Sequence, residues 1–202
     1  IGPNPPGRVG ISTATVTVTV TCVDDPPTAV DDAATGPEDA EATTIDVLAG
    51  DPDCAMAYWG LALAFGPNLN DWNPQDRERM AYEAIQNAQA RKERISQVEK
   101  DFIDALATRY DGKAYELRDS LNSAYASAMT KLATRYPNDA EIQTLCADAI
   151  MNTMPWNYWK SDGSPKPATA QPKNILEVVL EKFPDHPGAH HLYIHLVEAS
   201  PT

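Results

Sequence analysis

The spacing of apolar residues changes once along the chain, near residue 53, and this change most constrains the fold. Before it, residues 11–23 read ISTATVTVTVTCV, in which apolar residues and Thr alternate with a period of two. After it, apolar residues recur every three or four positions. The first spacing is typical of a half-buried strand and the second of an amphipathic helix. We therefore predict an extended strand and acidic linker segment over 1–53 and a helical domain over 54–202.

The same boundary divides the charge. The chain has a formal net charge of −13, of which residues 1–53 contribute −9 and residues 54–202 contribute −4. This acidic balance argues against a nucleic-acid binder, because phosphate contacts need clustered Lys and Arg. No run of 18 apolar residues occurs, so we expect no membrane span. We also expect no signal peptide within the chain, which begins with Ile1; a signal removed from an exported protein is compatible with this.

Residues 11–23 predict one long strand of roughly 40 Å, at about 3.3 Å per residue. Its apolar face consists of Ala14, Val16, Val18, Val20 and Cys22. The opposite face is Thr, and the many Thr and Ser residues are candidates for O-linked glycans. A second, shorter strand is predicted at 43–48. Two strands alone are marginal in water, so the long strand needs a partner from elsewhere.

The segment Ala29-Val30-Asp31-Asp32, followed by Ile45-Asp46-Val47-Leu48-Ala49-Gly50-Asp51, resembles the joints of bacterial cadherin-like and immunoglobulin-like adhesin repeats. In those joints a Thr/Val strand runs into a linker, although the remainder of the sandwich is missing here. The resemblance implies a calcium site at the acidic pairs Asp24, Asp25, Asp31 and Asp32. A solvated acidic linker is the alternative.

The three cysteines, Cys22, Cys54 and Cys146, include no C-x-x-C pair, which argues against a structural zinc knuckle. At least one thiol is free or bonded between chains. A Cys22–Cys54 disulfide is expected if the protein is extracellular, and small buried thiols are the alternative.

Beyond residue 53 the apolar spacing predicts helices and no sheet. Asp139 is the expected N-cap of one of these helices. The predicted helices are residues 54–65, 74–92, 95–110, 115–136, 140–151, 174–183 and 187–199, with a Trp- and Pro-rich insertion at 154–173.

Short motifs recur in the helical part. Ala107-Thr108-Arg109-Tyr110 returns as Ala133-Thr134-Arg135-Tyr136, and Arg135-Tyr136-Pro137-Asn138 returns as Lys182-Phe183-Pro184-Asp185. With the run from Asp51 to Gly60, this rhythm resembles a bacterial family of tetratricopeptide-repeat proteins over most of 51–202. The resemblance implies a mainly α fold, a tetratricopeptide-like array of antiparallel helix pairs, and it implies no biochemical activity.

All four histidines lie within ten residues. A zinc or copper site would use His186, His190, His191, His195 and Glu198. His191 and His195 are one helical turn apart, a spacing that can chelate Zn²⁺ or Cu²⁺, while packing of the four rings is the alternative. The H-E-x-x-H motif, a phosphate-binding loop and a dinucleotide fingerprint are all missing from the sequence, so we expect no enzyme. Trp156 and Trp159, in the insertion, either pack or stack on a sugar or peptide.

Two functions from different classes follow. In the first, the chain is a structural subunit of an extracellular filament, and residues 11–23 join it to a neighbouring copy by strand addition. In the second, it is a soluble tetratricopeptide scaffold that binds a peptide or a metal ion in its groove.

Overall fold

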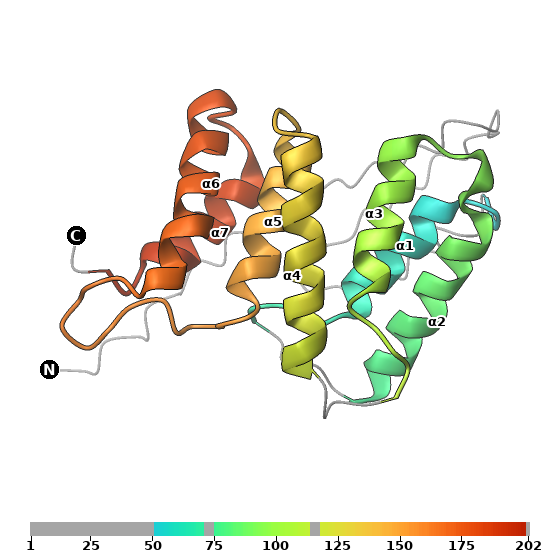
Figure 1. The fold of residues 1–202 in the computed structure, drawn as a ribbon, viewed down its shortest axis with the longest axis horizontal. Coiled ribbons are helices and arrows are strands. Elements are labelled where there is room, and N and C mark those ends of the chain that lie inside the picture. Colours follow the sequence, from blue (N-terminus) through green and yellow to red (C-terminus); the bar gives the residue numbers. More distant parts are fainter. Residues whose placement is uncertain (1–50, 71–74, 114–117, 201–202) are drawn as a thin grey trace, which may run out of the picture.

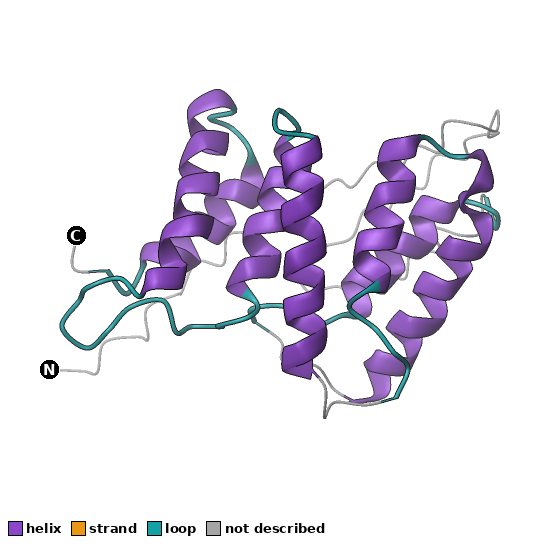
Figure 2. Ribbon diagram, in the orientation of Figure 1, coloured by secondary structure: helices purple, strands orange, loops and turns teal. Residues whose placement is uncertain are grey.

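The structure, a computed structural model, describes residues 51–70, 75–113 and 118–200. This part of the chain is mainly helical and contains no strand, as predicted (Figures 1 and 2). Seven α-helices run in the order α1 (Ala55–Phe65), α2 (Gln75–Arg91), α3 (Gln97–Ala107), α4 (Arg118–Arg135), α5 (Ala140–Met151), α6 (Ala170–Lys182) and α7 (Pro187–Val197). Short 3₁₀ turns follow α2 (Lys92–Arg94) and precede α6 (Pro167–Thr169).

Local side chains explain several of the helix starts. Asp139 caps α5 as predicted, since its Oδ1 accepts from the Ile142 N–H at 3.0 Å. Ser96 and Glu99 form a reciprocal capping box at the start of α3. The cap of α7 is a histidine, because Nδ1 of His186 accepts from the Ala189 N–H at 3.3 Å.

The insertion before α6 is shorter than predicted. We expected it to continue to Lys173, but α6 already begins at Ala170. Pro172 lies in the first turn, where a helix has no acceptor for the missing N–H, so this proline is compatible with the helix. The loop between α5 and α6 is correspondingly limited to residues 152–166, followed by the 3₁₀ turn (Figure 2).

Successive helices pack against one another along the chain, and α1 also contacts α3, as α5 contacts α7. Figure 1 shows α1 to α3 at one end of the molecule, α4 and α5 in the middle, and α6 and α7 at the other end. This arrangement is compatible with a helical repeat. None of the described helices is long and apolar enough to cross a bilayer.

Helix α5 joins two hydrophobic clusters. Ile142 and Cys146 belong to the cluster shared with α1 to α4, whereas Ala147 and Met151 belong to the cluster shared with α6 and α7. Because both faces of α5 are covered, it is apolar around most of its circumference. Each fully buried Leu, Ile or Met contributes about 1.5–3 kcal/mol before entropy costs, so α5 holds the two ends of the array together.

Several predictions lie outside the described residues. These are the strand at 11–23 with its apolar face, the shorter strand at 43–48, the acidic pairs proposed to bind calcium, and Cys22.

Candidate functional site

A polar pocket of about 550 Å³ opens near the start of α4. Pro67 and Asn68 line it from the loop after α1, and Arg118, Asp119 and Asn122 line it from α4. The rest of the lining comes from residues 152–155 and 157, which follow α5. Four asparagines are among the lining residues, Asn68, Asn122, Asn152 and Asn157. Amide side chains both donate and accept, so the pocket suits a polar ligand.

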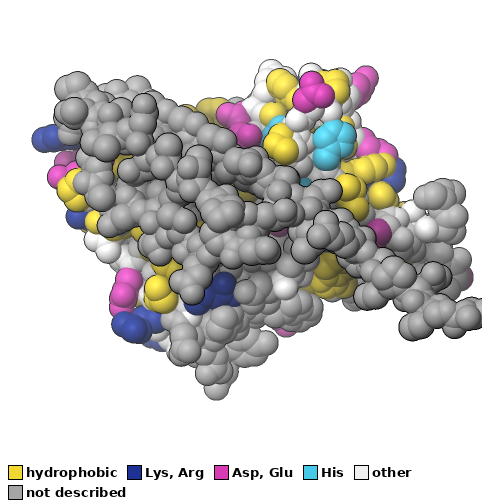
Figure 3. Space-filling view, turned by 180° about the vertical axis from the view of Figure 1, so that it is seen from behind, with side chains coloured by type: hydrophobic (Ala, Val, Ile, Leu, Met, Phe, Trp, Pro, Cys, Tyr) yellow, Lys and Arg dark blue, Asp and Glu magenta, His cyan; other side chains and the backbone are white. Residues whose placement is uncertain are grey.

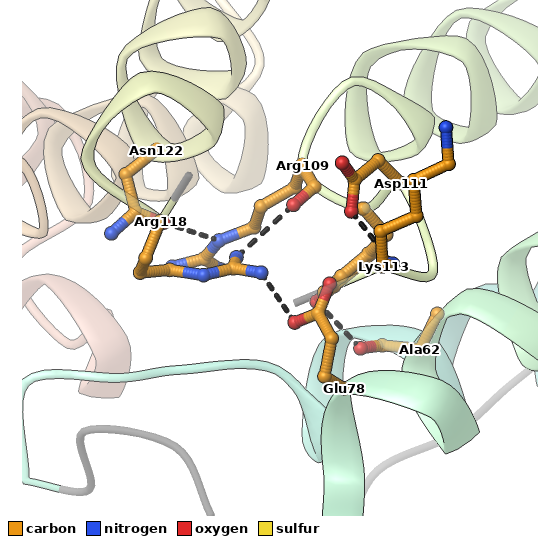
Figure 4. A network of polar contacts seen from close by, with 8 residues as sticks. Ala62, Glu78, Arg109, Asp111, Lys113, Arg118 and Asn122 are labelled. Carbon is orange, nitrogen blue, oxygen red and sulfur yellow. Dashed lines mark hydrogen bonds and ion pairs between the residues drawn. The ribbon is translucent and has the colours of Figure 1, made fainter. Parts of the chain in front are cut away.

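Arg118 connects this pocket to buried charge. Its Nη2 pairs with Oε2 of Glu78 from α2, and both side chains are less than 10% exposed, at 9% and 5%. Its Nη1 donates to the backbone carbonyl of Arg109 at 3.0 Å, and the guanidinium lies 5.8 Å from the centre of the Tyr110 ring (Figure 4). These contacts hold the guanidinium in one orientation beside the pocket.

A second buried arginine lies behind Asn122. Nε of Arg109 donates to Oδ1 of Asn122 at 3.3 Å (Figure 4), and Nδ2 of Asn122 donates to the carbonyl of Asn152 at 3.4 Å. Nδ2 of Asn152 donates in turn to the carbonyl and to Oδ1 of Asp148, both at 2.9 Å. Burial raises the pKa of Asp148, although the charge of Arg109 and the hydrogen bond from Asn152 oppose this shift.

Tyr110 contacts both Arg118 and the end of α1. Its hydroxyl donates to the carbonyl of Ala62 at 2.8 Å, and burial raises its pKa to about 12. Gly66 lies directly against this hydroxyl, since a Cβ on Gly66 would be 2.0 Å from Oη of Tyr110. Any larger residue at this position would displace the tyrosine.

Both insertion tryptophans are anchored through their indole nitrogens. Nε1 of Trp156 donates to the carbonyl of Leu69 at 2.7 Å, and Nε1 of Trp159 donates to the carbonyl of Leu196 at 2.6 Å. Trp156 has a positive φ of 58°, unusual for a bulky residue, and it remains 47% exposed. Trp159 therefore packs onto α7, whereas Trp156 is anchored by its nitrogen and presents part of its ring to solvent.

The four histidines have different partners, and only the rings of His191 and His195 are in contact with each other. His186 caps α7, and its Nε2 lies 3.4 Å from both Oγ1 of Thr144 and Oε1 of Glu141. His190 is exposed with its Nε2 beside the Pro184 carbonyl. The rings of His191 and His195 do meet, with centroids 4.6 Å apart, and Nδ1 of His195 lies 3.6 Å from Oε1 of Glu198.

Histidine side chains are visible among hydrophobic ones on the α6–α7 side of the molecule (Figure 3). Within the described ranges, no group of three or more His, Cys, Asp or Glu side chains is arranged to hold a metal ion. The metal site therefore stays a prediction. Of its predicted residues, His191 and His195 are in ring contact and Glu198 lies beside His195.

The cysteines fall into two chemical states. Cys54 is disulfide-bonded, and Cys146 is a buried free thiol whose pKa is raised by burial. Cys22, the predicted partner of Cys54, lies outside the described residues, so the pairing stays a prediction.

Sequence patterns gave no indication of the buried polar network. Arg109 and Arg135 occupy equivalent positions in the recurring Ala-Thr-Arg-Tyr motif, yet Arg109 is 1% exposed and the side chain of Arg135 is 62% exposed. Only the tertiary contacts distinguish them. The available signal is the pair of asparagines after α5, Asn152 and Asn157, together with Asn122 in α4.

We compared the chain with protein-family models, with curated proteins and with solved structures, and no match was found in any of the three comparisons.

Proposed function

We propose that the chain is a structural subunit of an extracellular, self-assembling filament. The observation that carries this proposal is the strand predicted at 11–23, in which Thr and apolar residues alternate over ten positions, from Thr13 to Cys22. The described residues contain no strand with which it could pair, and the strand predicted at 43–48 is less than half as long. Addition to a neighbouring subunit would satisfy its backbone N–H and C=O groups.

The apolar face of this strand supplies the driving force. Burial of Ala14, Val16, Val18 and Val20 would contribute roughly 5 kcal/mol before entropy costs. The Thr face would stay in contact with water or carry glycans. A subunit that donates a strand at one end and accepts one at the other makes a heterologous contact, and such contacts propagate into open filaments.

The described helices offer apolar surface to a neighbour. Among the described residues, five large hydrophobic side chains are more than 40% exposed, and four of them lie in the last third of the chain, at Trp156, Val178, Phe183 and Ile194. Helical arrays usually cover their terminal faces with polar residues. Exposed apolar side chains on α6 and α7 therefore support an intersubunit contact at this end.

The disulfide at Cys54 supports an extracellular location. Disulfides persist in oxidising compartments and are rare in the cytosol. A filament outside the cell would benefit from this covalent restraint at the start of α1.

Electron microscopy of the full chain at micromolar concentration tests the proposal. Replacing Val16, Val18 and Val20 together by Lys should abolish filaments, because three charges would enter the buried strand face. The matched control replaces Thr15, Thr17 and Thr19 by Lys, which changes the same strand and the same charge on the wetter face. Filaments from the Val variant, or a wild-type chain that stays monomeric at high concentration, would overturn the proposal.

The second candidate is the soluble scaffold, and the polar pocket beside Arg118 is the observation that favours it. Asparagines can pair with the N–H and C=O groups of an extended peptide. Selection of displayed random peptides on the full chain, with counter-selection on an Asn122→Leu variant, would reveal such binding. A monomeric chain that enriches peptides only through the intact pocket would favour the scaffold over the filament.

A further inference from the structure

Arg109 is a buried cation behind the pocket. It is 1% exposed, and among the described residues no carboxylate lies within 4.0 Å of its guanidinium nitrogens. The guanidinium lies 4.8 Å from the centre of the Tyr125 ring, and its Nη2 has no hydrogen-bond partner in the part of the chain that the structure describes. Because removing a charge from water is costly unless it is paired, this arginine favours an anion nearby.

Asn122 lies between Arg109 and the polar pocket, because it accepts from Arg109 and also lines the pocket. Its Oδ1 accepts from Arg109, which polarises the amide and makes its NH₂ group a better donor. The same NH₂ group makes only a long bond of 3.4 Å to the carbonyl of Asn152. The side chain lines the pocket and can therefore donate to a ligand there.

Arg118 is a cation in the pocket lining itself. Glu78 and the Arg109 carbonyl hold its two terminal nitrogens, while its Nε is buried and has no hydrogen-bond partner. The other charged lining residue is Asp119, an exposed carboxylate. The lining also includes the amide side chains of Asn68 and Asn152, and the apolar residues Pro67, Met154 and Pro155. A fixed cation with amide donors beside it suits a ligand with several acceptor oxygens.

We propose that this pocket binds a small oxyanion group, a carboxylate or a phosphate, with Asn122 and Arg118 as its donors. The negative charge of the bound oxyanion would offset the positive charge of Arg109, with the Asn122 amide between the two groups.

Thermal unfolding of the full chain tests the proposal, with sodium phosphate, sodium acetate and sodium chloride compared at equal ionic strength and pH. Phosphate, acetate or both should raise Tm above the chloride value. The response to each anion identifies the source, because a phosphate ligand predicts a shift with phosphate and a carboxylate ligand predicts one with acetate.

Two charge variants at the rim give opposite expectations. Asn68→Asp keeps the turn, in which Oδ1 of Asn68 accepts from the Asn70 N–H at 2.9 Å, but adds a negative charge. We expect it to weaken anion binding about three- to tenfold. Asp119→Asn removes a negative charge and should strengthen binding by a similar factor. The matched control is Asn138→Asp, an exposed change between α4 and α5 and outside the pocket lining.

Anion-dependent shifts that fall with Asn68→Asp, rise with Asp119→Asn and stay unchanged with Asn138→Asp would support the site. Equal shifts in all variants would show a general salt effect and overturn it, as would no shift with either anion. The outcome is separate from filament assembly, since none of these residues lies in the predicted strand.

Discussion

Arg118, in the first turn of α4, forms a buried ion pair with Glu78 of α2, forty residues earlier in the chain. The pair joins two helices that are not consecutive, and it lies directly beside the polar pocket. Its strength can be tested by substitution.

Arg118→Met should destabilise the fold by about 3–5 kcal/mol, because it leaves the Glu78 carboxylate buried without its main cationic partner. The double variant Glu78→Gln/Arg118→Met should recover a large part of this loss. Urea unfolding measures both free energies. Arg79→Ala is the control, since Arg79 pairs with Glu83 at the surface and should change stability by less than about 1 kcal/mol. A loss for Arg118→Met no larger than the control would contradict the prediction.

Gly66 and Tyr110 should be energetically coupled. Gly66→Ala places a Cβ 2.0 Å from Oη of Tyr110 and should cost about 1–3 kcal/mol. Tyr110→Phe alone should cost about 1 kcal/mol, because the hydrogen bond to the Ala62 carbonyl is lost. Together the two changes should cost less than their sum, since the clashing oxygen is gone. A double-mutant cycle from denaturant unfolding measures the coupling, and strictly additive losses would show that the contact is not tight.

The pH dependence of stability should report on Asp148. Burial raises its pKa in the folded state, with Arg109, Asn152 and His191 opposing the shift. The folded chain then holds this proton more tightly than the unfolded chain. The favourable contribution is complete below the ordinary pKa of 3.8 and is lost as pH rises through the folded value.

Asp148→Asn removes this titration and keeps an oxygen that can accept from Asn152. The stability of the variant relative to the wild type should therefore rise with pH above about 4 and then level off. Urea unfolding at a series of pH values measures the difference. A difference that does not change with pH would show that Asp148 titrates normally.

His186 should act as a helix cap. His186→Ala should cost about 1 kcal/mol, because the Ala189 N–H loses its acceptor, and His186→Asn should restore most of this loss. Since Nδ1 is engaged in the cap, we also expect a chelator to leave Tm unchanged. A large fall in Tm on chelation, reversed by Zn²⁺ and missing in His191→Ala/His195→Ala, would instead establish the metal site.

Much of the helical fold could be predicted from local patterns. The α5 helix has the predicted bounds, because the N-cap Asp139 and the spacing of the apolar residues can both be recognised within this segment of the sequence. The α6 helix begins at Ala170, four residues before the predicted start at Asn174, inside the segment predicted as a Trp- and Pro-rich insertion. Pro172 is compatible with the first turn, and the buried residues Leu176 and Val179 hold the helix in place.

The candidate site was not predictable in the same way. Its members come from the loop after α1, from α4 and from the segment after α5, and no local period connects them. The histidines are close in sequence but do not form one cluster. His186 accepts from the Ala189 N–H, whereas His190 lies beside the Pro184 carbonyl. Proximity in sequence is a weak guide once side chains on a helix point in different directions.

The sequence alone determined the helical character of the described residues and the cap at Asp139, since propensity, capping and apolar period are local properties. The strand at 11–23 stays a prediction from the same kind of local pattern. The tertiary structure alone decided that Arg109 is buried while Arg135, in the same four-residue motif, is exposed. Burial of a charged side chain depends on which helices pack around it. Arg109 lies beside Tyr125 and Asn122 of α4, whereas Arg135 ends that helix at the surface and pairs with Asp101.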